Sequence, residues 1–212
     1  VYQELYLRII ECSMKPGETI FKQKIADEFK LSQGPVRDAI LRLQSEDLVE
    51  VVPQSKTSVT LIDLQNAHDL HFLRVSVEVE VARLLTRKVE KHQINLLNNL
   101  VERLEFELKA GNGSTFKERD SNFHEELFRL AGVENLFHLI NTRRGHYDRI
   151  RGLYLMDEHR REEVIDDHKN IVRGLSSGNP EDAVKAVRSH LGKSLAVIPE
   201  IQSDYPNYFL KH

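Results

Sequence analysis

The chain has 212 residues and a formal net charge of −3, with 40% hydrophobic, 30% charged and 7% aromatic residues. This mixture excludes a chain that is disordered throughout, and the length predicts one or two compact domains. No apolar run approaches the roughly 20 residues of a membrane-spanning helix, and no signal-peptide pattern opens the sequence. Cys12 is the single cysteine. An internal disulfide is therefore excluded, and we expect a cytoplasmic protein without a membrane partner.

The first sixty residues predict three short helices followed by a β-hairpin. The expected elements are a first helix with an apolar stripe from Tyr2 to Ile10, closed by the breaker Pro16-Gly17, then helices around 22–29 and from Ser32 onward. Two β-like runs follow, at 48–52 and 58–61. Ser32 is a typical N-cap, and Pro35 falls in the first helical turn, where no intrahelical N–H is needed. The polar stretch 53–57 is interpreted as the hairpin loop. This order of elements is typical of a winged helix-turn-helix.

After Asp63, a plausible helix cap, the periodicity of the sequence is helical throughout. Helices are expected at roughly 63–88, 91–110, 115–131, 135–153, 160–176 and 180–198. Asn179-Pro180 is a strong start for the last of them. We therefore predict a mainly α protein, with a winged helix-turn-helix over 1–62 and an all-α helical bundle over 63–200. The C-terminal tail, 201–212, has weak periodicity and is expected to be loosely held.

The helix that begins at Ser32 is a candidate recognition helix, because a helix-turn-helix places its second helix in the major groove, N-terminus first. Its exposed first residues would be Ser32, Gln33, Gly34 and Arg37. Gln33 can pair with a base edge, and Arg37 can bind a guanine edge or a phosphate. The lysines placed to meet the DNA backbone are Lys22, Lys24 and Lys30. Residues 15–42 hold six basic and four acidic side chains, so a solvated face on a small interaction domain stays the alternative.

Polar residues interrupt the apolar stripes of three later helices. Asp120 and His124 are four residues apart on one helix face, while His168 and His190 each break another stripe. Isolated buried charge is costly, so these groups must be paired or bound to a metal. One carboxylate and three imidazoles suit Zn²⁺, Ni²⁺ or Mn²⁺ and leave positions open for water or a ligand. The alternative is a set of hydrogen-bonded core histidines.

The remaining histidines lack this joint pattern, and most are interpreted as surface or interface residues. They are His68, His71, His92, His138, His146, His159 and His212.

The N-terminal segment is similar to the DNA-binding domain of GntR-type transcription regulators. The similarity rests on Pro16-Gly17-Glu18, on Ile25-Ala26, on Ser32 and on Pro35-Val36-Arg37-Asp38-Ala39. It implies docking to a double-stranded DNA operator, with Ser55 and Lys56 at the tip of the wing. The family usually has Arg in place of Gln33, often Thr in place of Gly34, and Arg-Gly at the wing tip. These departures concern the operator sequence and not the docking mode.

Two later segments resemble the all-helical FCD effector domain of the FadR-type branch: ERDSNFHEELFRLAGVENLFHLI and DDHKNIVRGLSSGNPEDAVKAVRSHL. In metal-binding members an Asp-x-x-x-His pair and two later histidines hold a divalent ion, which implies that role for Asp120, His124, His168 and His190. Asp167 stands where the family commonly has Glu. The run RVSVEVEVARLL is similar to the first effector-domain helix, with Arg74 and Glu78 in the places of an Arg and a Glu.

Together these features predict a metabolite-responsive, DNA-binding transcription regulator that acts as a homodimer. A small carboxylate effector would bind at the metal, and Arg74 is the candidate for its second charge partner; the alternative for Arg74 is an ordinary ion pair with Glu78. A metal-dependent hydrolase with an accessory winged helix is the alternative function, and a helical interaction module is a third. Apart from Asp120 the sequence places no obvious general base, and it shows no catalytic motif, so we expect no enzyme and no catalytic residues.

Overall fold

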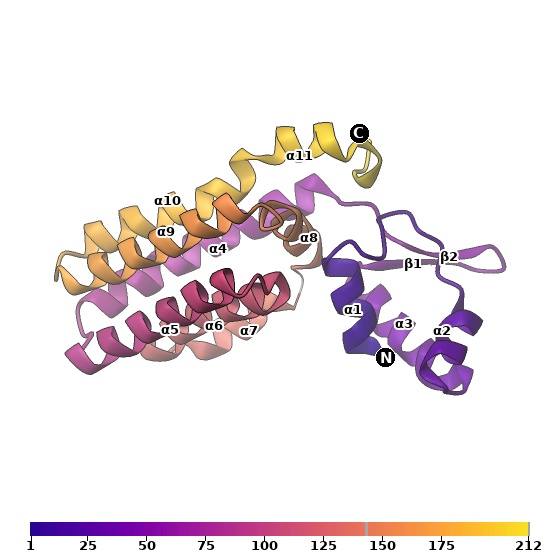
Figure 1. Ribbon diagram of the computed structural model, residues 1–212, viewed down its shortest axis with the longest axis horizontal. Helices are drawn as coiled ribbons and strands as arrows, with labels where there is room; N and C mark the ends of the chain where they lie inside the picture. Colours follow the sequence, from indigo (N-terminus) through magenta and orange to yellow (C-terminus); the bar gives the residue numbers. More distant parts are fainter. Residues whose placement is uncertain (143, 212) are drawn as a thin grey trace. The chain divides into compact units, whose positions relative to one another are not determined.

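The computed structural model describes residues 1–142 and 144–211 (Figure 1). It is mainly helical, with one two-stranded sheet, as the sequence predicted. The chain divides into two compact units. Unit 1 comprises Val1–His68, Thr142–Leu153 and Ile198–His212, and unit 2 comprises Asp69–Asn141 and Tyr154–Val197. The predicted linear boundaries at 62 and 200 stay predictions, because this division follows packing and not chain order.

The N-terminal part of unit 1 has the order of a winged helix-turn-helix. Its elements are α1 (Tyr2–Ile10), α2 (Lys22–Phe29), α3 (Gln33–Ser45), β1 (Val49–Val52) and β2 (Lys56–Val59). The strands are antiparallel, with Val49 opposite Val59 and Val52 opposite Lys56. Strand β2 therefore begins two residues earlier than the sequence suggested. Buried apolar side chains from all three helices and both strands form the core of this part, and Leu5, Ile9 and Leu43 are fully buried in it.

The helix expected over 135–153 is two helices, α7 (Glu134–Asn141) and α8 (Gly145–Tyr154). Asn141, Thr142 and Gly145 all have low helix propensity, which an unbroken apolar periodicity does not reveal. Gly145 also lies against the side chain of Leu48, and a Cβ atom at this position would collide with it. Most of α8 belongs to unit 1, whereas α7 belongs to unit 2.

The C-terminal segment is anchored in unit 1 and is not the loosely held tail that weak periodicity suggested. It contains α11 (Ile198–Asp204) and a 3₁₀ turn over Pro206–Tyr208. The backbone N–H of Ile62 donates to the carbonyl of Tyr208 at 2.8 Å, and the N–H of Leu210 donates to the carbonyl of Ile62 at 3.0 Å. Phe209, between these bonds, is buried. A single buried aromatic residue and a backbone pairing carry no periodic signal; His212 lies outside the described residues.

A buried polar cluster joins α8 to the segment that leaves the wing. The side chain of Arg149 is fully buried and donates to the carbonyl oxygen of Thr60 at 2.5 Å and to that of Gly145 at 3.2 Å. The Nδ1 atom of His146 accepts from the backbone N–H of Asp63 at 3.0 Å and from Arg149 at 2.8 Å. Burial and the nearby Arg149 lower the pKa of His146 to about 4. The assignment of His146 to a surface or interface is therefore wrong.

Unit 2 is a bundle of long helices. They are α4 (Leu64–Thr86), whose first residues belong to unit 1, α5 (Lys91–Lys109), α6 (Gly113–Ala131), α7, α9 (Glu158–Ser176) and α10 (Pro180–Ala196). The Asn179 side chain accepts from the backbone N–H of Glu181, which confirms the predicted start of α10. Helices α9 and α10 approach closely at Gly174, where a Cβ atom would come within 2.8 Å of the Ala183 backbone. Within the described residues, no helix combines the length and apolar character that crossing a bilayer requires.

Candidate metal centre and DNA-contacting surface

Unit 2 brings the four predicted metal ligands together in its interior. Asp120 and His124 come from α6, His168 from α9 and His190 from α10. One ligand atom from each residue lies within 4.8 Å of all the others, and all four residues are buried. Residues from three helices that are far apart in sequence therefore share a single location.

The spacing of these atoms fits a divalent metal ion. The Nε2 atoms of His124 and His190 are 3.2 Å apart, and Nε2 of His168 is 3.4 Å from Oδ1 of Asp120. Nitrogen and oxygen ligands that bind Zn²⁺ at about 2.0–2.2 Å in a tetrahedral arrangement lie roughly 3.2–3.6 Å from each other. Three imidazoles and one carboxylate are also a donor set that borderline divalent metals accept. The residues present are thus suited to a metal in both distance and chemistry.

A carboxylate from α4 lies behind the first of these histidines. The Oε2 atom of Glu78 is 2.7 Å from Nδ1 of His124, and its Oε1 atom is 2.8 Å from Nη2 of Arg74. Burial by itself would raise the pKa of Glu78, but Arg74 and His124 outweigh it and hold this pKa well below its usual range. Arg74 is buried in this ion pair. Arg74, the predicted effector-binding residue, thus contacts Glu78, which in turn contacts the candidate metal ligand His124.

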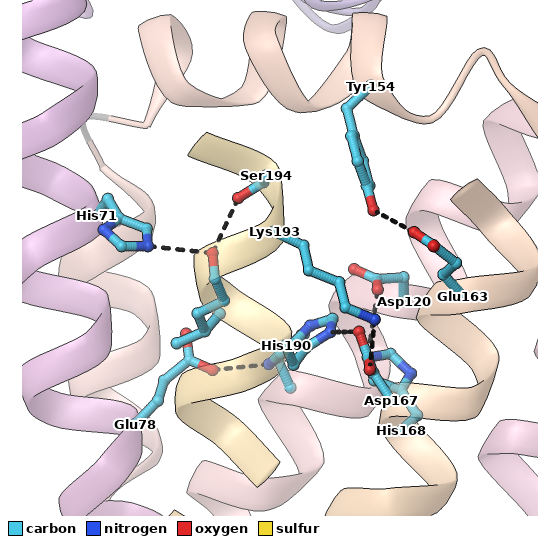
Figure 2. Close-up of polar contacts among 12 residues, drawn as sticks. His71, Glu78, Asp120, Tyr154, Glu163, Asp167, His168, His190, Lys193 and Ser194 are labelled. Atoms are coloured by element: carbon cyan, nitrogen blue, oxygen red, sulfur yellow. Dashed lines mark hydrogen bonds and ion pairs between the residues drawn. The ribbon is translucent and has the colours of Figure 1, made fainter. Parts of the chain in front are cut away.

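A second carboxylate lies behind His190 (Figure 2). Oδ2 of Asp167 is 3.5 Å from Nδ1 of His190, and its Oδ1 accepts from Nζ of Lys193 at 2.8 Å. Burial alone would raise the pKa of Asp167, but the contacts with His190 and Lys193 outweigh burial and lower this pKa below its usual value. Lys193 is partly exposed, which places the outer end of this chain of contacts at the surface of the bundle.

Ring packing fixes the orientation of the third histidine. The imidazole of His168 stacks on the ring of Phe123, with centroids 4.0 Å apart and planes at 14°. The rings of His124 and His190 also stack, at 5.1 Å and 24°. Because each of the three imidazole rings packs against another ring, the nitrogen atoms of the histidines point in defined directions. Aromatic contacts as well as hydrogen bonds therefore orient the side chains of this Asp-His₃ cluster.

The predicted DNA-contacting residues lie in unit 1, around the N-terminus of α3 and the hairpin. Those exposed to solvent are Lys24, Ser32, Gln33, Gly34, Arg37, Ser55 and Lys56, while Lys22 is half-buried. Helix α3 buries its opposite face, so its first turn is free to meet a groove. Ser55 lies in the hairpin turn and Lys56 begins β2. The side-chain amide of Gln33 donates to the side chain of Gln23 on α2.

Two family models match the chain and together cover most of it. Residues 1–59 match the bacterial regulatory proteins of the gntR family, and residues 69–193 match the FCD domain. The chain belongs to the GntR family, with an FCD domain. This agrees with the resemblance found from the sequence motifs in both halves.

Relatives of this GntR-family regulator are themselves described as transcriptional regulators. One from Streptomyces ambofaciens, an uncharacterized HTH-type transcriptional regulator in an unstable DNA locus, is 27% identical over 99% of this chain and 88% of its own length. The HTH-type transcriptional repressor RspR of Escherichia coli K12 is 22% identical over 99% of this chain and 92% of its own. The protein is thus a transcriptional regulator of GntR/FCD type, and the alternative of a metal-dependent hydrolase finds no support.

Solved structures confirm the fold class of the regulator. McbR/YncC of E. coli superposes with a TM-score of 0.73 at 16% identity, covering 94% of this chain and 95% of that one. A GntR regulator from Rhodococcus sp. RHA1, titled a putative transcriptional regulator, gives a TM-score of 0.76 at 18% identity with the same coverage. At these identities the similarity concerns the fold alone.

The sequence pattern did not reveal Glu78 as a partner of His124 or Asp167 as a partner of His190. Glu78 is visible in the sequence as one half of a pair with Arg74 on α4, but His124 is far along the chain and only the folded bundle shows the contact. Asp167 directly precedes His168, yet its carboxylate contacts His190. The usable signal is a carboxylate on an otherwise apolar helix face, which requires a buried partner.

Arg37 provides a test of the recognition-helix assignment. If its guanidinium contacts a base edge, Arg37→Ala should cost roughly 1–3 kcal/mol of operator affinity and relax the sequence preference at one position. If it contacts only phosphate, affinity should fall about equally for all sequences and the salt dependence should become shallower. Fluorescence anisotropy with labelled DNA at several salt concentrations distinguishes the two. Unchanged binding would remove α3 from the interface.

Proposed function

We propose that this regulator holds a divalent metal ion at its buried Asp-His₃ centre and that the ion anchors a small carboxylate effector, which controls binding to a DNA operator. The proposed ligands are Asp120, His124, His168 and His190, and the proposed metal is Zn²⁺, Ni²⁺ or Mn²⁺. The observation that carries the proposal is the convergence of four buried donor atoms at distances that suit metal ligands.

An anionic effector would need a positive charge inside the bundle. A carboxylate entering a helical core needs a cation, because burying an unpaired anion is costly. When bound, a divalent ion supplies that charge. Arg74 is proposed as the second charge partner of the effector. Its guanidinium already contacts Glu78 at 2.8 Å, so the effector would have to share that contact or replace it.

A homodimer is proposed because helix-turn-helix proteins commonly read two half-sites about 34–36 Å apart, one with each subunit. Such a dimer would act on operator DNA in the cytoplasm, and the exposed residues of α3 and the hairpin would contact the DNA. Light scattering at micromolar concentration should therefore give twice the 24.6 kDa mass of the chain. A monomer under these conditions would contradict the assembly.

The effector and the metal are tested together by thermal shift. Protein stripped with a chelator and protein reloaded with Zn²⁺, Ni²⁺ or Mn²⁺ are each melted with a panel of small carboxylic acids. We expect at least one acid to raise the melting temperature of reloaded protein and to have no effect on stripped protein, because its anchor is then missing. Equal stabilisation of both forms by the same acid would show that the metal does not anchor the effector.

A further inference from the structure

Two of the proposed metal ligands, His124 and His190, each have a carboxylate behind the imidazole ring. Glu78 faces Nδ1 of His124, and Asp167 faces Nδ1 of His190. The opposite ring atoms, Nε2 of the same two histidines, are the pair that lie 3.2 Å apart at the centre. Each ring therefore points one nitrogen outward to an acid and the other inward.

This arrangement constrains the position of the ring proton. A neutral imidazole carries one N–H, and a carboxylate beside Nδ1 favours the proton on that atom. Nε2 then keeps its lone pair and can act as a ligand. Acids that act in this way also fix the ring orientation and make the inward nitrogen more basic.

We infer that Glu78 and Asp167 are positioning residues that hold His124 and His190 with Nε2 as the metal-binding atom. The inference rests on the metal site proposed above and adds the residues that tune it. Neither acid needs to touch the metal.

The two acids are themselves held differently. Glu78 and its partner Arg74 are both buried, with contacts of 2.7 and 2.8 Å on either side of the carboxylate. Asp167 is 3.5 Å from His190, and its other partner, Lys193, has a side chain that is 37% exposed. Solvent screens the Asp167 arm more strongly than the Glu78 arm. Glu78 is therefore expected to contribute more to metal affinity than Asp167.

The test measures the affinity of the full chain for Zn²⁺ and Co²⁺ by competition with a chelator of known strength. Glu78→Gln and Asp167→Asn keep the shape of each side chain and remove its charge. We expect each substitution to weaken metal binding by roughly 10- to 100-fold, with Glu78→Gln nearer the upper end. Asp167→Glu, which restores the carboxylate, should recover most of the affinity lost in Asp167→Asn.

Two neighbouring acids serve as matched controls. Glu80→Gln on α4 and Asp166→Asn on α9 make the same chemical changes on side chains that are 55% and 75% exposed. Both should bind metal like the unmodified chain. The visible absorption spectrum of bound Co²⁺ and the ¹⁵N shifts of the histidine rings give readouts that do not depend on folding stability. A purely structural role for Glu78 or Asp167 would lower the melting temperature of the metal-free protein and leave these readouts unchanged.

The outcomes separate this inference from the proposed function. If the unmodified chain binds no metal, both are overturned. If it binds metal, loses it in His168→Ala and keeps full affinity in Glu78→Gln and Asp167→Asn, only the positioning role is overturned. If Glu78→Gln does not fold because Arg74 is left buried without its carboxylate, Asp167→Asn with its Asp167→Glu partner decides the question.

Discussion

Replacing His168 with alanine should abolish the rise in melting temperature that a divalent metal ion gives this protein. The imidazole of His168 is fully buried and lies 3.4 Å from Asp120, so the substitution removes one of the four proposed ligands from the interior of the site. A ligand at about 100 times its dissociation constant stabilises the folded state by about 2.7 kcal/mol. For a chain of this size that corresponds to roughly 5–10 °C, and nearly all of it should disappear in the variant.

The measured quantity is the difference in melting temperature between reloaded and chelator-treated protein, by differential scanning fluorimetry. The variant also leaves a cavity beside Phe123, which lowers the stability of both forms and so cancels in this difference. His92→Ala, at an exposed position on α5, is the matched control and should keep the whole increment. If His168→Ala keeps the whole increment, the four residues do not bind a metal together and are hydrogen-bonded core residues instead.

Replacing Arg149 with alanine should destabilise unit 1 by roughly 3–5 kcal/mol, the range for removing a large buried side chain. The substitution empties a fully buried volume and removes the donors that satisfy the carbonyl oxygens of Thr60 and Gly145. It also relieves the cost of a buried guanidinium, whose pKa burial lowers to about 10. The lost packing and the unsatisfied acceptors outweigh this relief, because the side chain has several hydrogen bonds to replace.

Urea unfolding followed by far-ultraviolet circular dichroism measures this loss. Arg149→Met keeps most of the side-chain volume without the donors, so its smaller loss separates packing from hydrogen bonding. Arg37→Ala, exposed on α3, should change stability by no more than about 0.5 kcal/mol. If Arg149→Ala and Arg149→Met are both as stable as the unmodified chain, the buried cluster around α8 does not stabilise unit 1.

Much of the fold could be predicted because it is carried by local periodicity. The apolar stripes of the long helices, the Asn179-Pro180 start and the order of the winged segment all lie within a few residues of each other in sequence. The break between α7 and α8 and the anchoring of Phe209 could not be predicted in this way. Both depend on contacts with distant residues, Leu48 in one case and the backbone of Ile62 in the other.

The same distinction holds at the candidate metal centre. Asp120, His124, His168 and His190 could each be identified because a polar residue breaks an apolar stripe. His146 shows the limit of that reasoning, since it is equally buried but contacts a backbone N–H and Arg149. The carboxylates behind the rings were not predicted as partners, because a tertiary contact between α4 and α6 cannot be inferred from either helix alone.

Unit 1 is built from three separate segments of the chain, which limits how its DNA-binding part can be exchanged between proteins. The polypeptide passes between the two units at four points, after residues 68, 141, 153 and 197. A chimera that joins only the winged segment to a foreign effector domain would leave behind the Arg149 donors to Thr60 and the backbone partners of Ile62. An exchangeable DNA-reading module would have to include α8 and the C-terminal segment, although neither is adjacent to it in the gene.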